Sequence, residues 1–235
     1  MRFRIDDAVL EQYPDVAIGV VLARGIDNRL GNEPAAGFLF ERVKATRSAW
    51  TADRLASDPR ILAWREAYRA FGAKPKKHRS SVENLIRTVL DRGEIPSINP
   101  VVDVYNTISL KHVVPVGGDD LDRVAGDIRL TIAAGTERFV PLNATDAVSP
   151  KPGEVVYRDD EDVLCRRWNW RECDKSKMTE ASTDIALVVE GLPPISRGDI
   201  ARITAELAET IERTVGPIDG ATVHLLDRDT PSIDL

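Results

Sequence analysis

Cysteine, histidine and aromatic residues are scarce in this sequence, and each shortage excludes a class of protein. The 235 residues include 2 cysteines, 3 histidines and 6% aromatic residues. Cys165 and Cys173 match neither a CxxC redox pair nor the spacing of a zinc site, so we interpret them as reduced, structural thiols. The histidines have no neighbouring partners for catalysis or metal binding. We therefore expect no metal and no other cofactor.

Long hydrophobic runs are also missing. The longest nearly unbroken apolar run, Ala17 to Ala23, is far shorter than the roughly 20 residues that cross a membrane. Asp6 and Asp7 stand where a signal peptide would need apolar residues. These features predict a cytoplasmic protein without a membrane partner.

Basic residues are outnumbered, 32 against 38 acidic ones, which gives a formal net charge of -6. This balance argues against a general phosphate-binding surface, and we expect no DNA partner. One segment, Gly72 to Arg79, is locally basic and directly precedes a helix predicted to begin at Ser80. Cations beside the free amides of a helix start favour a phosphate site, and the cations here are Lys74, Lys76, Lys77 and Arg79.

The order of hydrophobic patterns indicates an α+β fold with a mixed or antiparallel sheet. Apolar periodicity and capping residues predict helices over 34–57, 59–71, 80–90, 98–112 and 197–215. For 98–112 the β-branched content leaves a strand as the alternative. Alternating or continuous apolar runs predict strands over 3–5, 16–23, 127–134, 153–159, 162–170, 184–191 and 221–227. We expect a turn at Gly117-Gly118, a polar helix or turn over 119–126 and a polar tail after 227.

The run RRWNWR is the most unusual chemical feature. Strand alternation would place Arg167, Asn169 and Arg171 on one face and the tryptophans on the other. A polar, basic face of this kind suits a carboxylate, a phosphate or a ribose edge, and tryptophans suit a core or a stacking platform. The competing interpretation, with tryptophans in the core and arginines in surface ion pairs, has about equal weight.

The stretch from Pro75 to Glu190 resembles the B3/B4 domain of the bacterial phenylalanyl-tRNA synthetase beta subunit. The segment SSVENLIRTVL is followed by IPSINPVVDVYNTISLKHVVP, which matches the core motif of that family at Asn99, Val101, Val102, Asp103, Asn106, Leu110 and Pro115. The segments GGDDLD, DIRLTIAAGTERFVPL and STDIALVVEGL then follow in the order of the family.

This resemblance implies a three-layer α/β domain around an unusual β-sandwich. We expect a single domain over 1–235, with a family-like core over about 75–192 and an N-terminal strand-and-helix elaboration over 1–71. In the synthetases this domain hydrolyses tyrosine wrongly esterified to the phenylalanine tRNA. The implied function is hydrolysis of misacylated tRNA in trans by a free-standing protein, whose partner is the tRNA acceptor end or an aminoacyl-tRNA.

The resemblance also implies site residues. Asn106 matches an asparagine near the editing pocket, Glu190 is similar to the pocket glutamate, and Asp120 matches a family aspartate, whereas Gly117 replaces the family histidine. We hypothesise that Glu190 or Glu137 orients water or the substrate ammonium and that Asn106 fixes the amino acid. Arg167 and Arg171, with Asn169 on the same predicted face, would hold the terminal nucleotide, and the basic segment would bind tRNA.

Two other functions remain open from the sequence. The same pocket could serve a non-catalytic module that binds tRNA or a free amino acid. Alternatively, RRWNWR with Trp50 and Trp64 could form a protein interface, since tryptophan and arginine are enriched there. The sequence does not fix the amino acid, the tRNA or the oligomeric state.

Overall fold

Two β-sheets and a layer of helices build the protein, which we describe from a computed structural model over residues 1–29 and 33–235. In the four-stranded sheet the order is β3 (Val116–Asp120), β8 (Ile185–Gly191), β2 (Ala17–Ala23) and β9 (Ala221–Leu226), all antiparallel. In the six-stranded sheet the order is β10 (Ser232–Asp234), β1 (Arg2–Ile5), β4 (Ile128–Ile132), β5 (Val155–Arg158), β6 (Val163–Arg166) and β7 (Arg171–Glu172).

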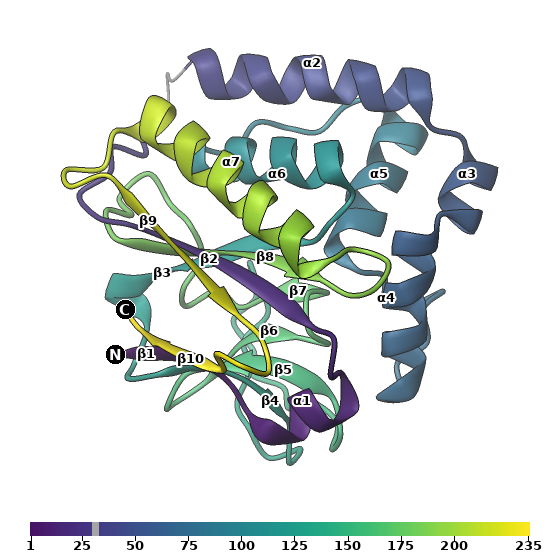
Figure 1. Ribbon diagram of the computed structural model, residues 1–235, viewed down its shortest axis with the longest axis vertical. Helices are drawn as coiled ribbons and strands as arrows, with labels where there is room; N and C mark the ends of the chain where they lie inside the picture. Colours follow the sequence, from purple (N-terminus) through teal and green to yellow (C-terminus); the bar gives the residue numbers. More distant parts are fainter. Residues whose placement is uncertain (30–32) are drawn as a thin grey trace.

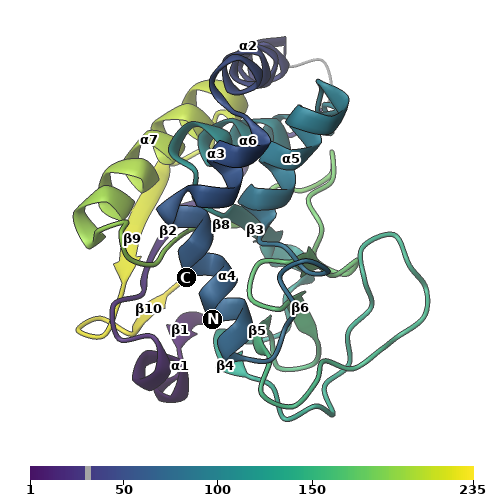
Figure 2. The ribbon, with the colours of Figure 1, turned by 90° about the vertical axis from the view of Figure 1, so that its right-hand side faces the viewer.

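The helices cover one face of the four-stranded sheet and one side of both sheets (Figure 1). Above the sheet lie α2 (Glu33–Ala49), α5 (Ser81–Arg92), α6 (Pro100–His112) and α7 (Arg197–Val215). Along the side run α3 (Ala52–Ser57) and α4 (Pro59–Ala70), with α4 beside both sheets (Figure 2). Two short elements remain, α1 (Asp7–Gln12) and the 3-10 turn η1 (Leu121–Arg123).

Strand β2 shows why the layers stack in this order. All seven of its residues are buried, as expected for a strand covered on both faces. Ile18, Val20 and Leu22 join the core between the two sheets. The alternate residues, such as Val21, join a second core under α6 and α7. The apolar run Ala17 to Ala23 is therefore the middle of a three-layer structure.

Local capping fixes most helix starts where the sequence predicts them. The Asp58 side chain accepts from the Arg60 amide with Pro59 in the first turn, and the Ser80 side chain accepts from the Glu83 amide. Ser196 and Asp199 form a capping box at the start of α7. Segment 98–112 is helical from Pro100 onward, as favoured over the strand, with Asn99 as the N-cap.

The α+β fold predicted from the sequence is confirmed, with five local corrections. The predicted helix 34–57 is two helices, because Thr51 caps a new one by accepting from the Arg54 amide. Gly117-Gly118 lies inside strand β3 rather than in a turn, since β3 pairs with β8. Strand 162–170 ends at Arg166, and the expected polar tail contains β10, which pairs with β1. Helix α1 has no counterpart in the prediction.

Candidate functional site

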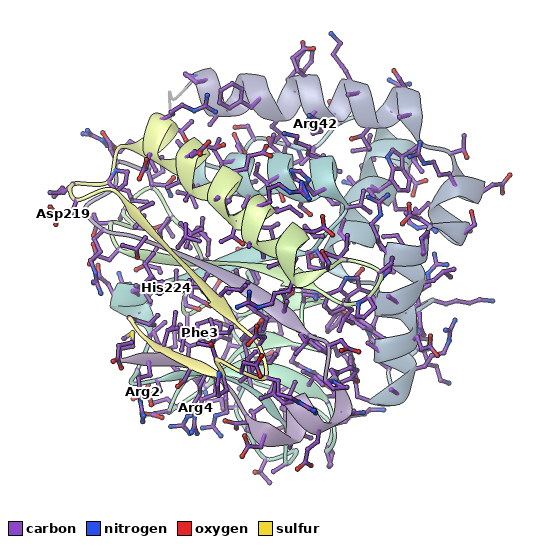
Figure 3. All side chains as sticks on the ribbon, in the orientation of Figure 1. Arg2, Phe3, Arg4, Arg42, Asp219 and His224 are labelled. Carbon is purple, nitrogen blue, oxygen red and sulfur yellow. The ribbon has the colours of Figure 1, made fainter. Side chains whose placement is uncertain are left out.

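A cavity of about 330 Å³ opens between the two sheets and the helices α5 and α6. Its walls come from β1, β3, β5, β6, β7 and β8 as well as from the two helices. Apolar and aromatic side chains dominate the walls and include Phe3, Leu85, Tyr105, Val116, Tyr157, Trp168, Trp170 and Val188. Phe3 projects from β1 between the sheets, while its neighbours Arg2 and Arg4 point outward (Figure 3). This size and lining are typical of a small-molecule pocket.

Glu190 is the best-buried acid of the cavity, with 1% of its surface exposed. It lies on β8, and its carboxylate accepts hydrogen bonds from Tyr157 Oη at 2.6 Å and Asn169 Nδ2 at 2.7 Å. The Asn169 oxygen in turn accepts from Tyr68 Oη at 2.9 Å, so the amide orientation is fixed. Burial raises the pKa of Glu190 to about 7, a rise that the hydrogen bonds from Tyr157 and Asn169 only partly oppose. Glu190 thus changes charge near neutral pH.

Two further acidic residues of the cavity lie on β3 and β7. Asp119 and Glu172 both line the cavity. Burial raises the pKa of Asp119 to about 6, with the like charges of Asp159 and Asp120 adding to the rise. Burial also raises the pKa of Glu172 to about 8, and there the Asp119 carboxylate adds to the rise. Cys165 on β6 also faces this region, but burial and the nearby carboxylates raise the pKa of its thiol well above normal. A thiol of that kind is a poor nucleophile.

The segment RRWNWR does not alternate as an extended strand. Arg167 and Trp168 have positive φ angles, 49° and 66°, and the chain turns back there between β6 and β7. Arg166 and Arg167 both pair with buried Glu154, at 2.9 Å and 3.1 Å. Trp168 is fully buried and packs edge-on against Trp64. The predicted shared face of Arg167, Asn169 and Arg171 is therefore wrong.

The structure brings part of the sequence-predicted site together. Asn106, Asn169, Arg171 and Glu190 all line the cavity, while Arg167 does not. Asp120 and Glu137 lie outside the lining as well. The Asp120 carboxylate accepts from Ser182 Oγ at 2.6 Å and caps η1. Glu137 accepts from the backbone amides of Ala134 and Gly135, at 2.7 Å and 2.8 Å.

Sequence reasoning missed Asp119, Glu172 and Ser81 as cavity residues. Asp119 directly precedes Asp120, which the sequence analysis selected as a site residue. Because β3 is a strand, neighbouring side chains point to opposite faces, so Asp119 and not Asp120 lines the cavity. The Ser81 hydroxyl, at the start of α5, is buried and makes no hydrogen bond to the residues that the structure describes. It is available to a ligand.

The basic segment lies at the rim of the cavity. Lys74, Lys76 and Lys77 are exposed, and the His78 ring packs edge-on against Trp170 with centroids 4.6 Å apart. Trp170 itself lines the cavity. The Ser81 amide, at the end of the segment, donates to the Asn169 carbonyl at 3.1 Å. The basic segment is therefore connected to the cavity wall through His78 and the Ser81 amide.

Over 1–29 and 33–235, no group of three or more histidine, cysteine or acidic side chains could hold a metal ion. In the same part of the chain, no helix has the length and apolar character needed to cross a membrane.

Comparison with known proteins confirms the resemblance seen in the sequence. A family model described as "B3/4 domain" matches residues 63–223. The phenylalanine–tRNA ligase beta subunit of Photorhabdus laumondii is 36% identical over 135 residues, which cover 56% of this chain and 17% of that protein. The subunit of Shewanella oneidensis is 26% identical over 147 residues, which cover 59% of this chain and 18% of that protein.

The chain thus matches less than a fifth of the length of these relatives. Among solved structures, an N-terminal fragment of the phenylalanyl-tRNA synthetase beta subunit from Pyrococcus horikoshii aligns with a TM-score of 0.44 and 11% identity. That alignment covers 94% of this chain and 49% of the fragment.

Proposed function

Because the chain belongs to the B3/4 domain family, we propose that it acts on aminoacyl-tRNA and hydrolyses wrongly attached amino acids in trans, in the cytoplasm. The observation that carries the proposal is the cavity with buried Glu190 inside it and the basic segment at its rim. The relatives named above are ligases that join phenylalanine to tRNA, so both halves of an aminoacyl-tRNA are ligands of the right class.

The proposed binding mode follows the chemistry of the walls. The amino acid enters the cavity, where Phe3, Tyr157 and Trp168 enclose its side chain and Glu190 accepts a hydrogen bond from it. The ester lies nearer the opening, beside Asn106 and the free Ser81 hydroxyl. Exposed Lys74, Lys76 and Lys77 then meet the phosphates of the acceptor end.

Hydrolysis in such a site needs little chemical assistance. The ester of an aminoacyl-tRNA is already activated by the neighbouring ribose hydroxyl. Holding a water and the ester carbonyl in a fixed arrangement, inside a cavity that admits few competitors, supplies much of the acceleration. Glu190, which is partly ionised near neutral pH, can hold the substrate or accept a proton.

The test is a deacylation assay on a panel of correctly and incorrectly charged tRNAs with wild-type protein, Glu190→Gln and Glu180→Gln. Glu180 is exposed and outside the cavity lining, so it is a matched control. We expect selective hydrolysis by wild type and by Glu180→Gln, and a loss of tenfold or more in Glu190→Gln, because a charge-assisted hydrogen bond is removed. Thermal unfolding checks that each variant is folded.

Two outcomes would contradict the proposal. Folded wild-type protein that hydrolyses no member of the panel would leave a non-catalytic tRNA- or amino-acid-binding module. Hydrolysis that is unaffected by Glu190→Gln would move the active site elsewhere.

A further inference from the structure

Gly117 and Glu172 compete for the same space in the cavity wall. A Cβ atom placed on Gly117 would lie 2.9 Å from Glu172 Oε1, closer than carbon and oxygen atoms normally approach. Both residues line the cavity, Gly117 from β3 and Glu172 from β7. The absence of a side chain at position 117 is therefore what allows the Glu172 carboxyl to occupy this part of the cavity.

Among the residues that the structure describes, Glu172 has no counterion. Within the described part of the chain, no side chain hydrogen-bonds to it and no cation lies within ion-pair distance. Only the Gly118 backbone interacts favourably with the carboxylate. Arg171, the neighbouring residue, is exposed, and its guanidinium donates to the Leu142 carbonyl at 3.4 Å.

The other groups around Glu172 are acidic or neutral. Asp119 on β3 and Glu190 on β8 are carboxyls, Cys165 on β6 is a thiol, and Tyr105 on α6 is a phenol. The Glu172 carboxylate contributes to the raised pKa values of Cys165 and Tyr105, which follow mainly from burial. Arg171 is the single cation among the lining residues that the structure describes. When these carboxyls are ionised, a cavity with this charge balance attracts a positively charged ligand.

We propose that Glu172 receives the ammonium group of the ligand, so that the cavity selects amines with an aromatic body over uncharged molecules of the same shape. Glu190, with its own shell of donors, meets the other end of the ligand. The identification of the amine with the α-amino group of an aminoacyl ester rests on the proposed function. The selection of amines by Glu172 does not.

Binding of an ammonium group should change the protonation of Glu172. Burial raises the pKa of Glu172 to about 8 in the empty cavity, with Asp119 adding to the rise, so at pH 7 most Glu172 carboxyls are protonated. A bound ammonium favours the ionised carboxylate. Binding at pH 7 should therefore release a proton, and affinity should increase as the pH rises toward 8.

The experiment uses two probes that differ by one amine, tyramine and 4-ethylphenol, with calorimetry on the full chain. The alkylammonium of tyramine stays charged, because such amines have pKa values near 10.4. We expect wild type to bind tyramine tenfold or more tightly than 4-ethylphenol at pH 8. At pH 7, titrations in buffers of different ionisation enthalpy should reveal the released proton.

Variants assign the effect to one residue. Glu172→Gln keeps the shape and should lose both the preference for tyramine and the proton release, while Glu180→Gln should keep both. Gly117→Ala should weaken tyramine binding, because the new methyl group displaces the carboxyl. Asp119→Asn is measured in parallel.

The proposal is overturned if wild type does not discriminate between the probes, if Glu172→Gln still prefers tyramine, or if only Asp119→Asn loses the preference. No tRNA takes part, so failure of the proposed function is distinguishable. Amine selection without tRNA hydrolysis would contradict only the proposed function. Hydrolysis without amine selection would contradict only the role of Glu172.

Discussion

At the scale of single residues, the carboxyl groups of the cavity are buried at the expense of their hydration. Glu190 is almost fully buried and has two strong donors, yet its pKa still rises to about 7. Desolvation therefore outweighs the Tyr157 and Asn169 hydrogen bonds. Such groups are often functional, because the fold keeps them despite their unfavourable effect on stability.

This rise in pKa predicts how stability depends on pH. An unfolded glutamate loses its proton near pH 4.5, and folded Glu190 loses it near 7, so between these values the folded state holds more protons. Stability then falls as the pH rises through this window. Relative to Glu190→Gln, the wild-type free energy of unfolding should drop by about 3 kcal/mol between pH 5 and 8.

Urea denaturation of both proteins at several pH values measures this difference. The comparison with the variant cancels the contribution of the histidines, which titrate in the same window. Parallel stability curves for the two proteins would show that Glu190 is not the buried acid described here.

At the scale of elements, an ion pair connects helices α4 and α5 beside the cavity. Glu83 in the first turn of α5 is 2% exposed and accepts from the Arg65 guanidinium of α4 at 2.8 Å and 3.1 Å. Ser81 and Asn84, in the same turn, line the cavity. This ion pair therefore fixes both the packing of two helices and one wall of the site.

Glu83→Gln should destabilise the protein by about 3 kcal/mol, because it leaves the partly buried Arg65 charge without its partner. It should also weaken ligand binding through the displaced α5 wall. Asp91→Asn, at an exposed position of the same helix, should change stability by no more than about 0.5 kcal/mol. Urea titration of both variants tests this, and equal stabilities would contradict it.

Elements that depend on local signals could be predicted from the sequence, and those that depend on distant contacts could not. Asp58, Ser80 and Ser196 cap their helices through residues two or three positions away. In contrast, Gly117-Gly118 indicates a turn locally but lies in β3, where a Cβ on Gly118 would come within 2.3 Å of the Ala186 carbonyl of β8. The close approach of two strands requires Gly118, and the Glu172 side chain takes the space beside Gly117, so neither glycine marks a turn.

The candidate site shows the same division. Asn106 and Glu190 could be found by resemblance, and Asn169 and Arg171 from the unusual RRWNWR composition. Glu172 could not, because its place in the cavity depends on the chain reversal at Arg167 and Trp168. Positive φ angles at two non-glycine residues are stabilised by the buried Glu154 pairs and the core around Trp168, which no local pattern reveals.

At the scale of the whole molecule, an acidic protein carries one basic rim. The formal net charge is -6, whereas exposed Lys74, Lys76 and Lys77 directly precede His78 in the chain, and His78 packs on Trp170 in the wall of the cavity. Electrostatics should therefore orient a tRNA end toward the cavity. Binding should weaken with salt, with a shallow slope because few phosphates are contacted.

Lys76→Ala with Lys77→Ala should weaken tRNA binding and lower the slope of log affinity against log salt by up to about two, one for each lost phosphate contact. Lys44→Ala with Arg47→Ala removes the same charge from exposed positions on α2 and should leave the slope unchanged. Filter binding across salt concentrations measures both. The same loss in the two double variants would indicate a general charge effect.

The position of the tryptophans gives the cavity an optical signal of its own. Trp168 and Trp170 line the cavity, and Trp168 contacts the indole of Trp64, so occupancy will alter the emission of neighbouring fluorophores. Trp50 belongs to a separate helical cluster and supplies a steady background. Ligand arrival can therefore be followed by intrinsic fluorescence in stopped flow, with unlabelled protein and natural substrates.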